Sequence, residues 1–225
     1  CIPILINNEI IGIVNIARKF GSSADKITED DIKTLTTLTN LSGTAIQNAI
    51  YFTTKQKNEK YEQELAIAKR IQKNLLPQKI PQFDKFIFAA KSKSAHFIGG
   101  DYYDIIQLNR DSIGIIIADI VGKGIPAGLY MAVLKSILNR NILHELSPKE
   151  TLFRLNNIMY NDPVINKFIP LFYGIFDLDK NEFKFSNAGH EPSLIYRKNK
   201  FITVDAQGFP LGGCKNQEFE EKTLK

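Results

Sequence analysis

Two runs of strand-forming residues, separated by a short polar turn, most constrain how this chain can fold. Residues 102–108 (YYDIIQL) and 113–118 (IGIIIA) are rich in β-branched and aromatic side chains, and the residues between them are typical of a turn. This pattern predicts an antiparallel hairpin. Asp101 and Asp119 stand just outside the two runs, so the hairpin would bring both carboxylates to one end.

The residues around this hairpin predict an α+β domain. We expect a strand over 86–90 before it and, after it, a helix that has Pro126 as its first residue and runs to about Leu143. Residues 147–150 (SPKE) combine a Ser cap, Pro at the first helical position and Glu at the third, which predicts a second helix. Strand patterns return from Phe168 onward. Strands, two helices and more strands favour mostly antiparallel pairing.

The first part of the chain has its own pattern. Residues 2–6 and 10–16 are β-branched runs joined by Asn-Asn-Glu, which predicts a second hairpin. A loop with Gly and Ser at 21–23 follows, and Thr28 with Asp31 resembles a capping box at the start of a helix. The chain begins within an apolar run and without Met, and we expect it to be part of a longer protein.

A linker helix is expected over residues 51–77, where the sequence becomes more polar. Its apolar stripe is narrow and ends before Pro77. A long helix with a narrow stripe needs a partner, either a second copy of itself or the domain that follows. The stripe consists of Leu65, Ala68, Gln72 and Leu75, with Ile71 beside it.

Composition excludes several classes of protein. The formal net charge is +5, but no basic stretch is interleaved with aromatic residues and no DNA-binding motif is present, so we expect no nucleic-acid partner. Cys1 and Cys214 are the two cysteines, which predicts no disulfide framework and fits a reducing cytoplasm. No apolar run reaches the roughly 18 residues that span a bilayer.

Asp101 and Asp119 are candidate ligands of a divalent cation. Oxygen-only ligands suit Mg²⁺ or Mn²⁺, which keep several waters and need few protein ligands. Gly122 and Gly124 would let the backbone curl and bring a carbonyl toward the same ion. The alternative is that Asp after Gly99-Gly100 and the Gly-Lys-Gly run are ordinary turns. Asp104 is a weaker candidate, because alternation along the strand would point it either with Asp101 or into solvent.

Other chemistries find little support. Neither cysteine is followed by Arg six positions on, as in a cysteine phosphatase loop, and His144 lacks the second histidine of a helical zinc site. No nucleophile elbow or Walker-type phosphate loop is present. His190 is more typical of a turn histidine bonded to backbone than of a catalytic acid. Gly-Gly-Asp also occurs in diguanylate cyclases, but Tyr102 and Tyr103 replace the residues that this motif requires next.

Five motifs occur in order along the chain, namely AKRIQKNLLP, FIGGDYYD, IADIVGKGIPAGLYMAVLK, SNAGHEPSLIY and GFPLG. Together they resemble PPM-type serine/threonine phosphatases, and most closely the bacterial SpoIIE and RsbU branch. The resemblance covers roughly residues 66–225 and implies a β-sandwich flanked by helices, with two Mn²⁺ or Mg²⁺ ions in a cleft at one end.

The resemblance also implies functional residues. Asp101 and Asp119 would be metal ligands and the backbone carbonyl of Ile120 a third, with Gly100, Asp104 and Gly122 as neighbours of the site. The nucleophile would be a metal-bound water that attacks phosphorus in line, without a protein nucleophile. The substrate would be a phosphorylated anti-sigma-factor antagonist of partner-switching signalling.

Residues 1–50 resemble the C-terminal part of a GAF sensor domain, in PILINNEIIGIVNIARK and AIQNAI. The predicted organisation is therefore a partial GAF domain (1–50), a linker helix (51–77) and a phosphatase domain (78–225), with a homodimer formed through the GAF part and the linker. The family's later Thr-Asp-Gly motif and Asp pair do not occur by Lys225. We therefore expect this segment by itself to lack final strands and distal ligands, and to have little activity. A non-catalytic binding module with the same fold is the alternative function.

Overall fold

The structure is a computed structural model, and it divides the chain into two units, Cys1–Gln63 and Glu64–Lys225. The residues described are 1–7, 9–16, 27–83, 86–94, 97–122, 124–141, 147–162 and 167–225.

The first unit contains the predicted hairpin and most of one long helix. Strands β1 (Ile2–Ile6) and β2 (Glu9–Val14) pair antiparallel, and Asn7 enters the turn with a φ of 50°. Helix α1 runs from Glu29 to Leu75. Its predicted capping box is confirmed, because the Thr28 and Asp31 side chains each accept a hydrogen bond from the other residue's backbone N–H. The loop predicted at 21–23 lies outside the described residues.

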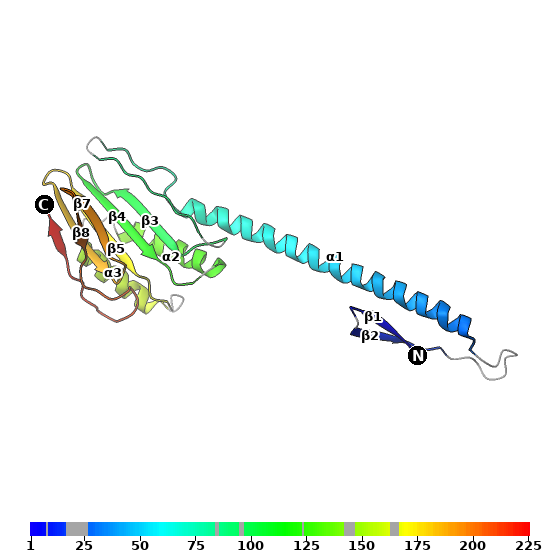
Figure 1. Cartoon of the computed structure of the whole chain (residues 1–225). Coiled ribbons are helices and arrows are strands. Elements are labelled where there is room, and N and C mark those ends of the chain that lie inside the picture. Colours follow the sequence, from blue (N-terminus) through cyan, green and yellow to red (C-terminus); the bar gives the residue numbers. More distant parts are fainter. Residues whose placement is uncertain are drawn as a thin grey trace. The chain divides into compact units, whose positions relative to one another are not determined.

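The predicted linker helix over 51–77 is the C-terminal part of a longer helix. Helix α1 continues through residue 50 without a break and ends at Leu75 (Figure 1). No described helix has a stretch that is both long and apolar enough to cross a bilayer.

The second unit is built on a five-stranded antiparallel sheet with the order β3-β4-β5-β6-β9. The predicted central hairpin is confirmed, since β3 pairs with β4 along the whole length of β3. The short last strand was not predicted from the sequence. The strands are β3 (Asp101–Gln107), β4 (Ser112–Asp119), β5 (Leu171–Asp177), β6 (Glu182–Ala188) and β9 (Lys222–Leu224).

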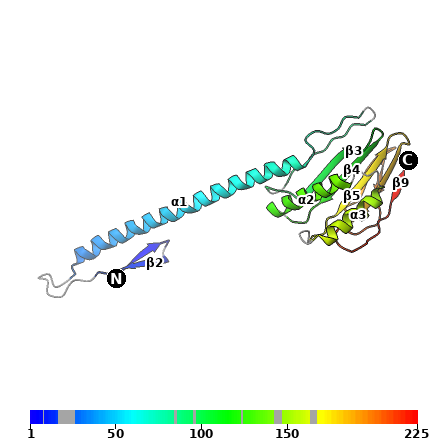
Figure 2. The ribbon, with the colours of Figure 1, turned by 180° about the vertical axis from the view of Figure 1, so that it is seen from behind.

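Two helices cover one face of this sheet, as Figure 2 shows. Helix α2 spans Ile125–Asn141 and α3 spans Pro148–Asn161. Pro126 is thus the second residue of α2 rather than the first, and Leu143 lies outside the described residues. The capping box predicted for α3 is confirmed by reciprocal hydrogen bonds between Ser147 and Glu150. The main core lies between helices and sheet, and includes Tyr102, Met131, Leu134, Leu155 and Tyr173.

The opposite face of the sheet carries a second hairpin, formed by β7 (Ser193–Arg197) and β8 (Lys200–Val204) (Figure 1). Phe172, Phe185, Val204 and Ala206 form a smaller core there. Among the described residues this layer is a two-stranded hairpin, so the predicted β-sandwich is present only in part.

The strand predicted over 86–90 is not part of any sheet in the described chain. Residues 86–94 nevertheless alternate between half-buried and exposed along their length, as a strand over a sheet would. Phe86 packs against Phe176 of β5, with ring centroids 5.7 Å apart. The sequence pattern therefore identified the extended conformation but not the lack of a hydrogen-bonded neighbour.

Candidate metal centre

Asp101 and Asp119 lie directly opposite each other, because they are register partners at the ends of β3 and β4. Both side chains are exposed. Burial of these charges therefore does not by itself require a cation. What the structure provides instead is a pair of acidic side chains held side by side by the hairpin register.

The backbone carbonyl oxygen of Ile120 lies beside Gly100, next to this pair of aspartates. A Cβ at Gly100 would overlap the carbonyl oxygen of Ile120 and would lie 3.1 Å from Oδ1 of Asp119. The absence of a side chain therefore leaves a small space that a carbonyl and a carboxylate oxygen both face. The Ile120 N–H donates to the carbonyl of Gly100 at 3.0 Å, which holds the two backbone segments together.

The chain after Asp119 turns sharply. Gly122 and Gly124 have φ values of 123° and 76°, a region that side-chain-bearing residues rarely adopt. The Asp119 N–H donates to the carbonyl of Pro170, which ties this turn to the start of β5. The predicted curl of the glycine backbone is confirmed.

These residues fit a hard divalent cation. Carboxylate and carbonyl oxygens are the ligands that Mg²⁺ and Mn²⁺ prefer, and such ions keep several waters when protein ligands are few. The described chain nowhere gathers three or more His, Cys, Asp or Glu side chains in a metal-binding arrangement. Within the described residues, the candidate ligands are therefore Asp101, Asp119 and the Ile120 carbonyl.

Asp104 lies elsewhere. It is only 8% exposed, and its carboxylate accepts hydrogen bonds from the Tyr102 hydroxyl at 2.8 Å and from the Ile105 N–H at 2.9 Å. Both orientations expected from the sequence, toward Asp101 or into solvent, are therefore wrong. Because side chains alternate along a strand, Asp104 shares the helix-covered face with Tyr102, away from Asp101. Burial, and then the Asp104 charge, raise the pKa of Tyr102, so its hydroxyl stays a donor.

A polar cluster that sequence reasoning missed lies at the C-terminal end of β6. Buried Asn187 donates to the carbonyl of His190 and to the Asp205 carboxylate, both at 2.8 Å, and accepts from the His190 N–H. The His190 ring bonds the Glu191 carbonyl, so the turn interpretation of this histidine is confirmed. The Asn-Ala-Gly-His run in the sequence indicates the turn. It does not indicate the hydrogen bond from Asn187 to Asp205.

This cluster lines a cavity of about 450 Å³ that also includes Gly189 and Phe209. Ala118, next to Asp119, pairs with Leu171 of β5, and Leu171 pairs with Ala188 of β6. The cavity and the paired aspartates are therefore at the same end of the sheet, and Asp119 on β4 is two strands away from β6.

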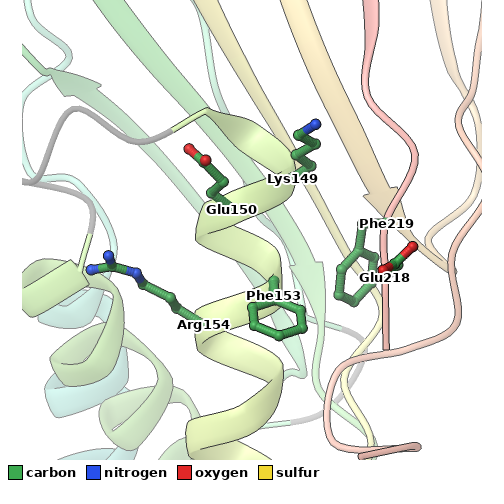
Figure 3. Close-up of a pocket in the computed structure, with 6 residues that line it drawn as sticks. All are labelled: Lys149, Glu150, Phe153, Arg154, Glu218 and Phe219. Carbon is green, nitrogen blue, oxygen red and sulfur yellow. The ribbon is translucent and has the colours of Figure 1, made fainter. Parts of the chain in front are cut away.

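A separate hollow of about 380 Å³ lies at the start of α3 (Figure 3). In Figure 3, Phe153 of α3 and Phe219 face each other across it, with Glu218 beside Phe219. Lys149, Glu150 and Arg154 complete its lining. None of these residues belongs to the candidate metal centre.

Known proteins share this fold. A structure of the PP2C phosphatase domain and a fragment of the regulatory domain of SpoIIE from Bacillus subtilis has a TM-score of 0.52 at 23% identity, covering 61% of this chain and 41% of that chain. The SiaA-PP2C domain of Pseudomonas aeruginosa has a TM-score of 0.59 at 18% identity, covering 75% of this chain and 68% of that one. The fold is therefore that of a PP2C-type domain, the class also called PPM.

The sequence comparisons define the family within this class. The phosphoserine phosphatase RsbU of Bacillus subtilis (strain 168) is 33% identical over 165 residues, which cover 72% of this chain and 49% of that protein. This chain thus spans about half the length of that relative. The family model described as Stage II sporulation protein E (SpoIIE) matches residues 109–225, more than half of the chain. The chain belongs to the SpoIIE family.

Proposed function

We propose that this protein is a metal-dependent hydrolase of phosphoserine or phosphothreonine in proteins. One observation carries the proposal, namely that the register of β3 and β4 sets Asp101 opposite Asp119 beside the Ile120 carbonyl. The relation to a phosphoserine phosphatase supports the reaction class. PP2C-type homologues depend on metal ions, which supports Mn²⁺ or Mg²⁺ as the cofactor, two ions in the complete site.

The residues of the chain would act by binding and orientation. When bound, the ions would lower the pKa of a coordinated water and draw charge from the phosphoryl oxygens. Asp101 and Asp119 would hold the ions, and Gly100 leaves the room in which the Ile120 carbonyl can join them. No side chain is needed as a nucleophile in this scheme. With two carboxylates, residues 1–225 by themselves are expected to hold these ions weakly, because water competes for the open positions.

The substrate and the regulation proposed here rest on family resemblance. The substrate would be a phosphorylated anti-sigma-factor antagonist, in partner-switching signalling in the cytoplasm. Residues 1–50 would be the end of a GAF sensor, and a homodimer would form through the sensor and α1. The exposed apolar side chains of α1 support a partner along this helix, among them Leu38, Leu41, Ile50 and Phe52.

A non-catalytic binding module is the second candidate. The observation that favours it is that the described residues bring together only two carboxylates, fewer than a tight dimetal site requires. The two candidates differ in turnover, since a binding module would retain its phosphoprotein ligand unchanged.

Release of phosphate tests the proposal. The full-length protein with a phosphoserine protein substrate is expected to release inorganic phosphate in the presence of Mn²⁺, to stop when EDTA is added, and to resume when Mn²⁺ is restored. The same protein with Ca²⁺ alone serves as the control, since Ca²⁺ prefers more ligands at longer distances. Turnover that persists in EDTA would exclude a metal-dependent mechanism, and binding without turnover would favour the second candidate.

Rotating one half of α1 relative to the other tests whether this helix transmits the state of the proposed sensor to the phosphatase domain. One residue inserted after Asn58 rotates the two halves of the helix by about 100° relative to each other, whereas seven inserted residues nearly restore the original orientation. We expect the single insertion to change the phosphatase rate of the full-length protein much more than the heptad insertion. Equal rates in the two variants at saturating Mn²⁺ would indicate a passive tether.

A further inference from the structure

Gln72 is a buried polar residue on a helical segment whose other polar residues are exposed. Its side chain is 7% exposed, whereas Lys69, Arg70 and Lys73 on the same turns of α1 are exposed. A buried amide is costly unless its donor and its acceptor both find partners. The partners of Gln72 therefore indicate why this position is polar.

Both partners belong to Gly99. Nε2 of Gln72 donates to the Gly99 carbonyl at 2.6 Å, and the Gly99 N–H donates to Oε1 of Gln72 at 3.2 Å. The side-chain amide therefore satisfies both backbone groups of this one residue. Among side chains of this length, an uncharged amide offers a donor and an acceptor in this arrangement.

Gly99 is held where it contacts Gln72. A Cβ at Gly99 would lie 2.5 Å from Oγ and 3.1 Å from Cβ of Ser94, so a side chain there would require Ser94 to shift. Ile98 before it is 1% exposed, and the Gly100 carbonyl after it accepts from the Ile120 N–H. Residues 98–100 are thus held by the core, by Gln72 and by Ile120 in succession, and the next residue is Asp101.

The last turn of α1 has a second attachment. The Nζ of Lys135, on α2, donates to the Leu75 carbonyl at the C-terminus of α1. Leu75 and Leu76 also pack against the main core. The end of α1 is therefore attached both to α2 and to the loop that precedes β3.

We propose that Gln72 is a positioning residue of the metal centre. Its amide sets the place of the Gly99-Gly100 backbone, and so aligns Asp101 with Asp119 and keeps the space at Gly100 open for the Ile120 carbonyl. This inference rests on the proposed metal-dependent function. It assigns to the C-terminal turn of α1 a direct mechanical connection to the metal-binding loop, through two hydrogen bonds of one side chain.

Two substitutions separate this role from packing. Gln72→Glu keeps the acceptor for the Gly99 N–H, loses the donor and places a carboxylate oxygen against the Gly99 carbonyl. Gln72→Leu keeps similar bulk and loses both hydrogen bonds. The control is Gln63→Leu, on the same helix at an exposed position. Asp101→Asn in the same series tests the metal centre itself.

The experiment measures Mn²⁺ binding to the full-length proteins by electron paramagnetic resonance, together with the dependence of phosphatase rate on Mn²⁺ concentration. For both Gln72 variants we expect the half-saturating Mn²⁺ concentration to rise about tenfold, equivalent to about 1.4 kcal/mol. We expect kcat to recover at saturating Mn²⁺, and Gln63→Leu to match the original protein.

The outcomes distinguish the inference from the function on which it rests. Unchanged Mn²⁺ binding in both Gln72 variants, with binding lost in Asp101→Asn, would overturn the positioning role and leave the proposed function standing. Full binding and turnover in Asp101→Asn would overturn the proposed function. Loss of the near-ultraviolet circular dichroism signal in both Gln72 variants would show that Gln72 maintains the fold as a whole, which also overturns the inference.

Discussion

Replacing Asp119 by asparagine is expected to abolish phosphatase turnover while leaving the fold intact. The substitution keeps the shape of the side chain but removes the negative charge that faces the space at Gly100. Loss of residues that only support metal ligands costs about 10- to 100-fold, so loss of a ligand should cost more than about 100-fold in activity. Phosphate release under Mn²⁺ titration measures the effect, and calorimetry measures Mn²⁺ affinity.

The matched control for this substitution is Asp111→Asn. Asp111 lies in the turn at the other end of the same hairpin, where its backbone forms hydrogen bonds with Asn109 and Leu178. The control removes the same charge from the same hairpin and should leave activity unchanged. Retained turnover with unchanged metal affinity in Asp119→Asn would show that the metal site has been assigned to the wrong residues.

Replacing Gly100 by alanine is expected to remove activity by a different route. The new Cβ would overlap the Ile120 carbonyl oxygen, and since that atom is backbone, the loop or the end of β4 must shift. Overpacking of this kind costs about 1–3 kcal/mol of stability. The same shift would displace the Ile120 carbonyl from the space at Gly100. Mn²⁺ affinity should therefore fall even where the protein remains folded.

Gly128→Ala is the control for this second substitution. Gly128 lies within α2, and a Cβ there would meet Cγ2 of Ile98 at 3.4 Å, an ordinary contact. Alanine in a helix interior is better by about 0.5–1 kcal/mol than glycine, so this variant should be as stable as the original protein or more so. Thermal melting and Mn²⁺ titration of both variants make the comparison. Full Mn²⁺ affinity in Gly100→Ala would show that the space at Gly100 has no part in metal binding.

The paired aspartates were predictable because hairpin register is a local property. Two strand-forming runs and a short turn determine which residues lie opposite each other, and that places Asp101 across from Asp119. The solvent exposure of their side chains was not predictable in the same way. An apolar run indicates that a strand is buried, but it does not show at which residue the strand becomes exposed to solvent. The buried orientation of Asp104 was also not predicted. Its carboxylate can face the core because the Tyr102 hydroxyl donates a hydrogen bond to it.

The boundary predicted at residue 50 followed a change in side-chain polarity, and α1 does not end there. From Thr44 to Leu76 the chain contains no Gly or Pro, so nothing in the backbone ends the helix where its apolar face fades. The change in side-chain pattern indicates a change in what the helix contacts. The backbone hydrogen bonds of the helix continue through it.

Contacts between distant segments could not be obtained from the sequence. Asn187 reaches Asp205 across the whole β7–β8 hairpin, and Gln72 reaches Gly99 from another element. In the sequence, Gln72 was part of an apolar stripe and its amide had no visible purpose. Strand β9 has three residues, too few for a periodic pattern, and it forms because β6 offers an unpaired edge.

The direct opposition of Asp101 and Asp119 also has a thermodynamic consequence. Like charges directly across an antiparallel pair repel each other and weaken the hairpin that holds them. A cation that binds both carboxylates cancels this repulsion and binds the folded chain in preference to the unfolded one. At a concentration of about 100 times its dissociation constant, such a ligand adds about 2.7 kcal/mol to the free energy of unfolding. The concentration of available metal would therefore affect the lifetime of the folded domain in the cell as well as its catalytic rate.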